Sequence, residues 1–494
     1  MNTKALRQKI LGLAIRGKLV PQNPNDEPAS ALLKKVRAQR EREANGGGHG
    51  KKAREATQGG RLDVEDAPFE LPEGWEWCRL GSIGTFVRGS GIKRSETAPT
   101  GVPCIRYGEL YTTYSVSMTE AVSFVGEELA DKSKVVRHGD LLLTLTGENK
   151  DEIAKTVAFM GNARTVIGGD LAIFTGHQQN PMYLSYMMNS PYALERKYML
   201  GTGDLIVHIS CEKLSSILIP LPPLAEQKRI AAAIEAAFAV IDEIERGKAE
   251  LRAAVTAARA KVLSLAICGK LVPQNPKDEP ASALLKKIRD QREIEANGGG
   301  RGKKAREAAQ GVMLDVEDAP FELPEGWEWV VLKDVGMYTS GKTPKPQELA
   351  SDGKYPYFKV ADMNTIGNEL YMDITPSYLG NDYTGVLFPE NSIVFPKNGG
   401  AVLTNKKRVL RKPSLVDLNT GIYTPTTLID FWYLFYFFTT IDFRNLFKGA
   451  ILPTLDRSVV EQMPFPLPPL AEQKRIVAAI EAAFGELDAI EAAL

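Results

Sequence analysis

The stretch LPPLAEQKRIAAAIEAAFAVIDEIE at residues 221–245 recurs as LPPLAEQKRIVAAIEAAFGELDAIE at residues 467–491, with 20 of 25 positions identical. Each copy begins with two prolines, which suit the start of a helix because the first helical residues need no backbone donor. After the first copy begins, apolar residues over 230–265 are spaced alternately by four and three positions, broken only by Lys248. This spacing is typical of a coiled-coil seam. It predicts one helix over residues 224–268, roughly 65–70 Å long at about 1.5 Å per residue.

The two ends of the chain extend the same pattern. Residues 470–494 align with the first part of the long helix and residues 1–16 with its last part. Together they are equivalent in position to 41 of its 45 residues. Gly17 and Gly269 follow at the equivalent places, where a glycine commonly ends a helix. We therefore expect the chain ends to form a second, broken helix, antiparallel to the first, in a pseudo-twofold frame. Two independent short helices are the alternative, because such patterns also arise from ordinary packing.

A second duplication lies before each variable segment. Residues 19–77 recur at 271–329 with 51 of 59 positions identical and a constant offset of 252. Residues 78–220 and 330–466 lie between the near-copies and resemble each other in no obvious register. We call them the first and second insert, and the repeated segments the frame. This period is too long for solenoid repeats of about 20–50 residues, so the 494-residue chain is expected to form two domain-sized units.

Both inserts have the patterns of mixed α/β structure. Strands are predicted at Asp140–Thr146, Val166–Phe174 and Asn391–Phe395, where apolar and β-branched residues run together. Pro181–Leu200 predicts a helix. The order of the strands in a sheet does not follow from these patterns.

Basic charge is concentrated in parts of the frame. Residues 29–43 and 281–295 predict a basic helix in each copy, and glycine-rich strings with lysines follow at 46–54 and 298–306. As flexible arms they would contact the phosphate backbone of DNA and release counterions. A solvated helix face followed by a linker explains the same residues equally well.

The composition is that of a globular protein without an excess of either charge. The 61 basic and 61 acidic residues cancel, so any nucleic-acid partner must be met by a local patch. The four cysteines form no CxxC pair, which argues against a zinc site and against a disulfide framework and fits a reducing compartment. The first 20 residues have an amphipathic helix pattern without a signal-peptide cleavage site. We therefore expect a cytoplasmic protein.

One segment has the letters of a nucleotide-binding loop. Gly336–Thr343, GMYTSGKT, fits the pattern G-x-x-x-x-G-K-T. That chemistry needs a helix that begins at the lysine, whereas Pro344 and Pro346 follow at once and disfavour helical geometry there. The segment is therefore not expected to bind a nucleotide.

No other pattern indicates catalysis or metal binding. Asn180–Tyr183, NPMY, is faintly similar to the Asn-Pro-Pro-Tyr motif of adenine methyltransferases, but its third residue is methionine and no glycine-rich cofactor motif accompanies it. A helix start explains it better. The histidines have no ligand spacing; they are His49, His138, His177 and His208. We expect no active site in this chain.

Two different domains on one repeated frame suit an extended ligand with two unlike ends. Duplex DNA fits, because its major-groove pattern recurs about every 34 Å and a rigid spacer lets each insert read one half of a split site. The repeated frame would hold two copies of one partner in the same way.

Frame motifs carry a resemblance to a known family, the specificity subunits of Type I restriction-modification systems. They are PEGWEW at Pro72–Trp77 and Pro324–Trp329, LPPLAEQKRI before a long helix, and KLVPQ at Lys18–Gln22 and Lys270–Gln274. The resemblance covers essentially the whole chain, and constant frames around two unlike inserts are typical of the family. It implies an α+β fold in which two mixed α/β target recognition domains are separated by two long antiparallel coiled-coil helices with pseudo-twofold, circular-repeat symmetry. The glycine-lysine strings depart from a minimal member.

The resemblance also implies function and partners. Each insert would read one half of a gapped, asymmetric site on double-stranded DNA, while the frame helices dock two adenine methyltransferase (modification) subunits, to which restriction endonuclease/translocase subunits are added. The chain itself would be non-catalytic and bind no cofactor or metal, whereas the methyltransferase uses S-adenosylmethionine and the restriction subunit ATP and Mg. A specificity subunit of a Type IIB-like gapped-site enzyme and a coiled-coil scaffold without DNA are the alternatives.

The expected layout follows the duplications. It comprises an N-terminal helix that completes the second spacer (1–17), a basic helix and arm (18–66), target recognition domain 1 (67–222), the central spacer helix (223–269), the repeated basic helix and arm (270–318), target recognition domain 2 (319–468) and the C-terminal spacer helix (469–494).

The candidate DNA contacts are charged, polar and aromatic residues in expected loops, because such side chains reach phosphates and base edges. In the first insert they are Arg88, Lys93, Arg94, Arg106, Tyr107, Glu109, Tyr111, Lys150 and Lys155. In the second insert they are Lys342, Thr343, Lys345, Lys359, Lys397, Asn398, Asn405, Lys406, Lys407 and Arg408. Trp75 and Trp327 in the frame are expected to anchor the core.

Overall fold

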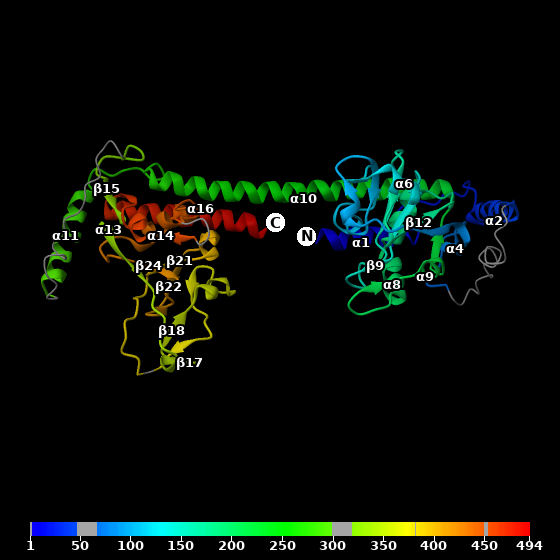
Figure 1. Cartoon of the computed structure of the whole chain (residues 1–494). Helices are drawn as coiled ribbons and strands as arrows, with labels where there is room; N and C mark the ends of the chain where they lie inside the picture. The colour runs from blue at the N-terminus through cyan, green and yellow to red at the C-terminus, as the bar shows by residue number, and fades with distance from the viewer. Residues whose placement is uncertain (1, 47–66, 299–318, 381, 449–452) are drawn as a thin grey trace. The chain divides into compact units, whose positions relative to one another are not determined.

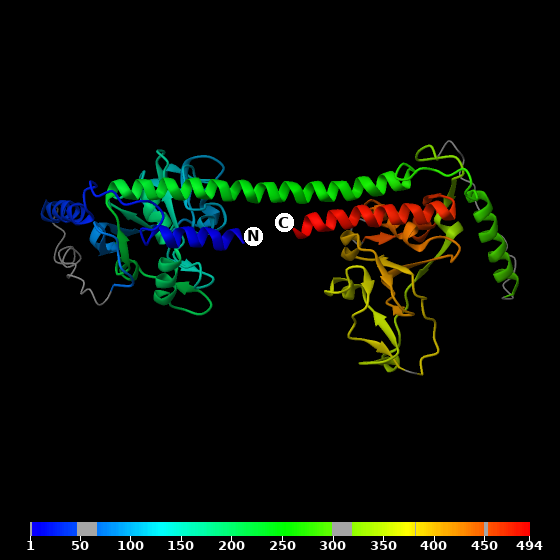
Figure 2. The ribbon, with the colours of Figure 1, turned by 180° about the vertical axis from the view of Figure 1, so that it is seen from behind.

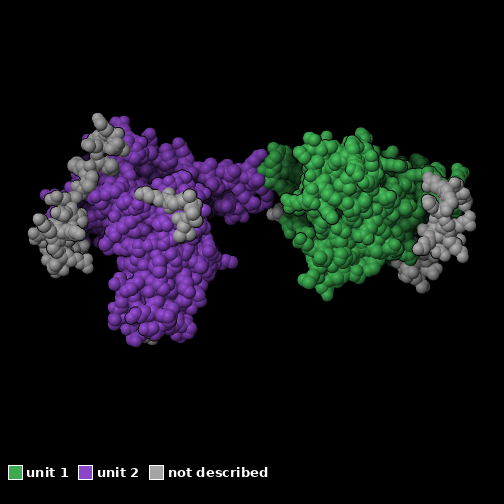
Figure 3. Space-filling view, viewed as in Figure 1, with its two compact units in different colours: residues 1–247 green, residues 248–494 purple. Residues whose placement is uncertain are grey.

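The chain forms two compact units. The computed structural model describes residues 2–46, 67–298, 319–380, 382–448 and 453–494. Unit 1 comprises Met1–Gly247 and unit 2 comprises Lys248–Leu494 (Figure 3). Apart from their first residues, the two glycine-lysine strings lie outside the described residues, as does His49.

One long helix, α10 (Leu224–Ile267), passes from unit 1 into unit 2 (Figures 1 and 2) and confirms the helix predicted from the apolar seam. It has 44 residues. Gly269 follows with φ +65° and Gly17 with φ +66° after helix α1 (Thr3–Ala14). Glycine adopts this left-handed geometry without strain, which explains why both helices end there.

In unit 1, α1 packs antiparallel to the first part of α10. Arg7 pairs with Asp242 at 2.5 Å and Glu245 at 3.1 Å. Further along α1, Leu11 lies in the same buried cluster as Ile234. Residue numbers therefore rise along α1 while they fall along α10, which defines the antiparallel direction.

In unit 2, helix α16 (Leu470–Ala492) packs in the same way on the second part of α10. Arg259 of α10 pairs with Asp488 and, at 3.6 Å, with Glu491. Ala266 lies in a buried cluster with Ile480. The direction is again antiparallel.

These two helix pairs repeat one contact. Arg7 and Arg259 are equivalent in the duplication, and each guanidinium also lies over a ring, 4.9 Å from the centre of Phe238 and 5.0 Å from the centre of Phe484. The circular repeat of the sequence is therefore matched by equal helix packing within each unit.

The expected second long helix is not shown. Among the described residues its place is taken by two separate helices, α1 with 12 residues and α16 with 23. The seam of α10 is also not buried throughout, because Ile244 in unit 1 is 36% exposed and Leu251 in unit 2 is 41% exposed.

A strand pair joins the frame segments on either side of each insert. In unit 1, β1 (Glu76–Arg79) pairs antiparallel with β14 (Leu218–Leu221). In unit 2, β15 (Glu328–Val331) pairs antiparallel with β27 (Pro464–Leu467). Each insert therefore begins and ends at the same point of its frame.

The first insert contains two five-stranded sheets. One has the order β2-β12-β8-β10-β5 and the other β3-β6-β4-β11-β7. The strands are β2 (Thr85–Arg88), β3 (Thr97–Ala98), β4 (Val102–Ile105), β5 (Ser117–Met118), β6 (Ser123–Val125), β7 (Lys134–Val136), β8 (Leu141–Thr144), β10 (Thr156–Phe159), β11 (Thr165–Ile167) and β12 (Leu171–Thr175); β9 (Thr146–Gly147) pairs separately with β13 (Val207–His208).

The second insert has the same strand order. Its sheets are β16-β24-β21-β22-β19 and β17-β20-β18-β23. The strands are β16 (Gly336–Ser340), β17 (Leu349–Ala350), β18 (Tyr355–Phe358), β19 (Tyr371–Met372), β20 (Tyr378–Leu379), β21 (Ile393–Pro396), β22 (Arg408–Leu410), β23 (Leu415–Val416) and β24 (Thr420–Pro425); β25 (Phe447–Lys448) pairs separately with β26 (Thr454–Leu455).

The two inserts therefore share one topology despite their unlike sequences. The parallel pairs also stand at the same places, β10–β5 and β11–β4 in unit 1 and β22–β19 and β23–β18 in unit 2. Only the β7 position lacks a named strand in unit 2, where Phe388 and Ser414 form an isolated bridge.

Helices cover the frame joint and the sheet ends. In unit 1 they are α2 (Ala29–Gly46), α4 (Leu80–Ile83), α5 (Tyr107–Thr112), α6 (Glu127–Lys132), α7 (Pro181–Met188), α8 (Pro191–Leu200) and α9 (Cys211–Ser215), with the 3-10 turn η2 (Arg94–Glu96). In unit 2 they are α11 (Ala281–Gly298), α13 (Leu332–Val335), α14 (Phe431–Thr440) and α15 (Arg457–Glu461), with the 3-10 turns η4 (Pro346–Glu348), η5 (Val360–Asn364), η6 (Gly400–Thr404) and η7 (Phe443–Asn445). The predicted basic helices are thus present as α2 and α11.

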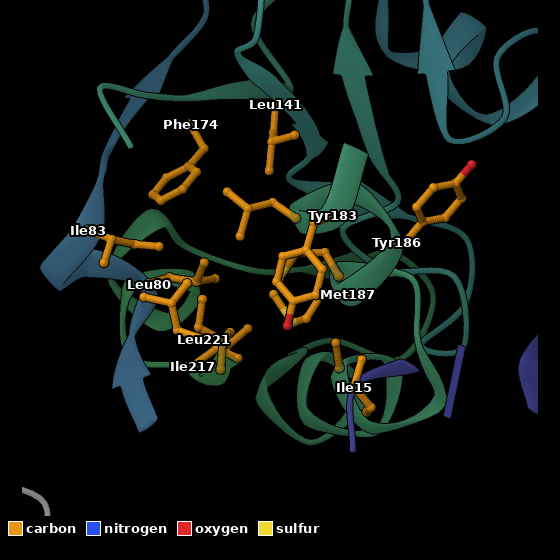
Figure 4. Close-up of a cluster of buried hydrophobic side chains, with 14 of the residues drawn as sticks. Ile15, Leu80, Ile83, Leu141, Phe174, Tyr183, Tyr186, Met187, Ile217 and Leu221 are labelled. Carbon is orange, nitrogen blue, oxygen red and sulfur yellow. The ribbon is translucent and has the colours of Figure 1, made fainter. Parts of the chain in front are cut away.

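The core of unit 1 lies where insert and frame meet (Figure 4). Phe174 of β12, Tyr183 of α7 and Leu221 of β14 are buried together there. The Tyr183 hydroxyl donates to the carbonyl of Pro220 at 2.7 Å, and in unit 2 that of Tyr433 donates to Pro466 at 2.9 Å. In both units the insert helix is thereby fixed in the same manner to the strand that leads back into the frame.

Trp75 and Trp327, the two frame tryptophans expected to anchor the core, are buried. Each is 6% exposed. The indole of Trp75 donates to Glu226 at 3.0 Å, and Gln22 donates to the same carboxyl at 3.2 Å. Burial nevertheless raises the pKa of Glu226 above its ordinary value. These bonds tie the start of α10 to the segments on either side of α2.

Three sequence predictions need correction. Val166–Phe174 is two strands, β11 and β12, because Gly168–Asp170 forms a turn between them. Pro181–Leu200 is two helices, since Ser190 begins a new one as its cap. Asp140–Thr146 is divided between β8 and β9.

The strand predicted at Asn391–Phe395 and the helix start predicted at Asn180 agree with the structure. Asn391–Phe395 overlaps β21, and Asn180 caps the start of α7 by accepting from the Tyr183 amide at 2.8 Å. Gly336–Ser340 is strand β16, and no helix begins at Lys342, so the segment lacks the geometry of a phosphate-binding loop. Within the described ranges, no helix is long and apolar enough to cross a membrane, and no group of three His, Cys, Asp or Glu is placed to hold a metal.

Candidate nucleic-acid interface

In unit 1 several candidates gather at the turn Gly168–Asp170, between β11 and β12. Arg88, the last residue of β2, donates from Nε to the Gly169 carbonyl at 3.2 Å and lies 3.8 Å from Asp170. Arg106 follows β4, which pairs in parallel with β11. A Cβ at Gly89, the residue after β2, would stand 2.1 Å from the carbonyl oxygen of Gly168, so the turn and the loop after β2 approach too closely for a side chain there.

Glu109 holds Arg106 in place. The carboxylate accepts from the Arg106 amide at 3.0 Å and from its guanidinium at 2.8 and 2.6 Å. Ser123 donates to the same carboxylate at 2.5 Å, and Glu109 is only 7% exposed. With its oxygens already engaged, Glu109 positions Arg106, while the arginine remains partly accessible.

Tyr111 and Lys155 use their polar groups inside the domain. The Tyr111 hydroxyl contacts Thr144 at 2.7 Å and donates to the Thr146 carbonyl at 2.9 Å, and burial raises its pKa to about 12. Lys155 donates to the carbonyls of Tyr111 and Tyr114 at 3.1 and 2.6 Å, and burial lowers its pKa. The ring of Tyr107 meets that of Tyr111 edge-on, with the ring centres 5.3 Å apart.

In unit 2 the equivalent turn is Asp417–Asn419, between β23 and β24. Lys359 follows β18 as Arg106 follows β4, and its amide donates to Asp362 at 2.8 Å as that of Arg106 does to Glu109. The Lys342 amide donates to the Val416 carbonyl at 2.8 Å, beside the turn.

Lys93 and Lys345 form a second equivalent pair. Each precedes a 3-10 turn, η2 or η4, and its amide donates to the glutamate three residues on at 2.6 Å, Glu96 or Glu348. Both lysines are exposed, as are Arg94, Lys342 and Thr343. The two inserts have no obvious common register in sequence, yet these basic residues occupy equivalent places in one topology.

Lys397 and Asn398 lie beside the turn in unit 2 and are partly buried. Lys397 donates to the Ser340 hydroxyl at 2.8 Å, and burial lowers its pKa. Asn398 donates to the side chain of Asn419 at 3.2 Å. Both side chains keep part of their surface toward solvent at the edge of the turn.

Residues 405–408 mainly stabilise the second insert. Asn405 has φ +53°, and its side-chain oxygen accepts from Lys407 at 2.7 Å and from the Phe443 amide at 2.9 Å. Lys407 is 7% exposed, lies 4.4 Å from the centre of the Phe443 ring and has its pKa lowered to about 8 by burial. Arg408 donates to the carbonyl of Lys407 at 2.9 Å, and burial lowers its pKa.

Two candidates stand apart from these groups. Lys406 hydrogen-bonds the side chain of Asn364. Lys150 lies 6.0 Å from the ring centre of Tyr198, on the loop between β9 and β10 in unit 1.

Sequence reasoning missed the two turns around which the candidates gather. The double glycine Gly168–Gly169 was the available signal in the first insert, because two glycines interrupt a strand. In the second insert, Asp417–Asn419 lacks glycine and gave no comparable signal.

Comparisons with known proteins place these features in context. Residues 72–252 and 324–494 both match the family model of the Type I restriction modification DNA specificity domain. The EcoAI specificity subunit of Escherichia coli, a type I restriction enzyme subunit, is 26% identical over 97% of this chain and 88% of its own length. The EcoEI specificity subunit of the same organism is 29% identical over 67% of this chain, which spans 61% of that relative.

Solved structures show the same fold. One, from work on complex assembly and conformational transition of the type I R-M system, is 18% identical with a TM-score of 0.60, covering 86% of this chain and 94% of that one. The HsdS subunit from Thermoanaerobacter tengcongensis is also 18% identical, with a TM-score of 0.52 over 87% of this chain and 94% of its own.

Proposed function

Because the chain belongs to the family of the Type I restriction-modification DNA specificity domain, which it contains twice, we propose that it is the DNA sequence-recognition subunit of a type I restriction-modification complex. Each insert reads one half of a gapped, asymmetric site. The observation that carries this proposal is the shared topology of the inserts, with Arg106 and Lys359 at one equivalent position and Lys93 and Lys345 at another.

The exposed candidates contact DNA, and the buried ones shape the surface. Four basic residues flank the two turns, Arg88 and Arg106 in unit 1 and Lys342 and Lys359 in unit 2. Their cationic groups are accessible to phosphate or guanine, so the edge of a DNA groove can approach each turn. Lys93, Arg94 and Lys345 add charge beside it. Glu109, Tyr111, Lys155, Lys407 and Arg408 set the positions of these loops through the internal bonds described above.

Helix α10 sets the spacing between the half-sites. Its 44 residues run from unit 1 into unit 2, so a change in its length changes the distance between the inserts. The repeated frame docks two adenine methyltransferase subunits, since each unit offers the same paired helices, and restriction subunits join through them. In this proposal the chain is non-catalytic; S-adenosylmethionine, ATP and Mg belong to the partners.

Mapping of methylated adenines tests this proposal. In cells that express the chain with its methyltransferase, we expect one bipartite motif to be methylated in both halves, and removal of this gene alone abolishes that motif. If every methylated motif survives the removal, the chain does not specify the site.

A further inference from the structure

Unit 2 has a surface cavity of about 370 Å³ next to the end of α10. This volume lies at the lower end of the range of about 300–1,000 Å³ typical of ligand sites. The cavity is lined by Cys268, Gly269, Lys270, Gln274, Phe321, Glu322, Leu323 and Pro324.

Every lining residue has an equivalent in unit 1 at an offset of 252, and seven of the eight are identical. The exception is Cys268, whose place is taken in unit 1 by Arg16. The walls are also built alike. Gln274 donates to the Gly269 carbonyl at 2.6 Å, and Gln22 donates to the Gly17 carbonyl at 2.7 Å.

The aromatic wall has the same geometry in both units. Phe321 meets Trp329 edge-on with ring centres 4.8 Å apart, and Phe69 meets Trp77 at the same distance. In each unit the tryptophan indole donates to the phenylalanine carbonyl at 3.3 Å. The phenylalanine ring is therefore held in a fixed orientation whether or not a cation lies over it.

In unit 1 the equivalent place is filled by the chain itself. The guanidinium of Arg16 lies 4.8 Å from the centre of the Phe69 ring, within the distance of a cation–π contact. The lysine and the glutamate of the lining, Lys18 and Glu70, are present there too. The lining of unit 1 therefore accommodates a guanidinium although Lys18 is present. Because the cavity of unit 2 has the same walls, these walls suit a planar cation.

We infer that the cavity on Phe321 is a binding site for an arginine side chain of a second protein. Unit 1 supplies this group from its own Arg16, whereas in unit 2, where Cys268 is short, no residue among those described places a cation over the Phe321 ring. The inference does not rest on the proposed DNA function, because it depends only on the duplicated walls. Through this difference a partner would distinguish the frame of unit 2 from the otherwise equal frame of unit 1.

A fluorine NMR titration tests the site directly. The chain has five tryptophans, so labelling with 5-fluorotryptophan gives five signals, which tryptophan-to-phenylalanine variants assign. With the full chain and N-acetylarginine amide as probe, we expect the Trp329 signal to shift and saturate at concentrations on the order of 10–100 mM, the weak affinity of a single cation–π contact. N-acetylleucine amide should leave it unmoved.

Two reciprocal variants provide the control. Cys268→Arg installs the residue of unit 1 and should abolish the Trp329 shift, whereas Arg16→Cys should make the Trp77 signal respond to the probe. Both positions follow helix ends and are not in the buried core, so the fold is retained. Overturning results are an unsaturable shift, equal shifts with the leucine compound, or a Trp329 response that persists in Cys268→Arg.

Discussion

Arg106 and Lys359 show how single residues in unlike sequences take one equivalent position in the fold. Each follows a strand that pairs in parallel with its neighbour, and each has its backbone amide bound by an acidic side chain three residues on. The acid fixes where the loop turns, and the basic side chain is left partly or fully exposed beside the turn. In this arrangement the loop geometry is constant, while the identity of the basic residue varies between inserts.

Replacement of Arg106 by alanine should weaken specific DNA binding of the assembled methyltransferase complex by about 1–3 kcal/mol, the usual value of one good base contact. The loss should concern the half-site read by the first insert, and Lys359→Ala should concern the other half. Competition binding with single-base variants of the site measures both effects. Unchanged affinity in both variants would remove these residues from the interface.

Lys197 is a buried cation whose energetic effect depends on pH. It is fully buried on α8, its amine donates to the Ala154 carbonyl at 2.8 Å, and burial lowers its pKa from 10.5 to about 7. Between pH 7 and 10.5 the unfolded chain binds more protons at this residue than the folded chain does. The stability of unit 1 therefore rises with pH in this window, by up to about 1.4 kcal/mol per pH unit.

The Lys197→Met variant should lose this slope while keeping the volume of the side chain. Urea unfolding of unit 1 at pH 7 and pH 9, compared between the parent chain and the variant, measures it. Lys132→Met on α6, where the lysine side chain is 68% exposed, is the matched control. Parallel pH profiles for the parent chain and Lys197→Met contradict the assignment.

At the scale of elements, the frame helices were predictable from the sequence, whereas for the inserts the mixed α/β class was predictable and the order of the strands was not. Duplication revealed the constant segments, and the spacing of apolar residues marked α10, because a long helix exposes its period in sequence. The strands of the inserts are mostly two to five residues long, and many are buried on both faces, as β8 and β10 are, so they show no alternation. Their order depends on pairs distant in sequence, such as β2 with β12.

The candidate site was likewise only partly predictable from the sequence. The positions of the basic residues in loops were visible in the sequence, but which side chains are buried was not. Lys407 and Lys359 are both lysines near a strand end, yet one is 7% exposed and the other is exposed. Lys407 is enclosed by Phe443 of η7 and by the side chain of Asn405, contacts that depend on the folded packing.

Helix α10 gives a prediction at this scale. Insertion of seven residues after Gly247 preserves the seam on both sides, because seven is the period of the seam. The contacts of Arg7 and Arg259 with their partners are left unchanged. The insertion lengthens the helix by about 10 Å, so the gap of the recognised site should grow by about three base pairs with both half-sites unchanged. A mapped methylation motif with an unaltered gap would contradict the spacing role.

At the scale of the whole molecule, the zero net charge is an average over unlike parts. The 61 basic and 61 acidic residues cancel, while each insert places several cations around one turn. Non-specific attraction to DNA should therefore be modest for the chain alone, and in the proposed complex the methyltransferase partners would supply further positive surface. Specificity then depends on the local loops and not on total charge.

The central claim is that each insert reads its own half of the site, and exchange of one insert tests it most directly. Residues 330–466 are replaced by the corresponding insert of a relative with a known site, and methylated adenines are mapped in cells that express the hybrid with its methyltransferase. Exchange of residues 78–220 is the matched control. We predict that each exchange changes one half of the motif and leaves the other half and the gap intact. A change in both halves after one exchange, or in neither, would contradict the account.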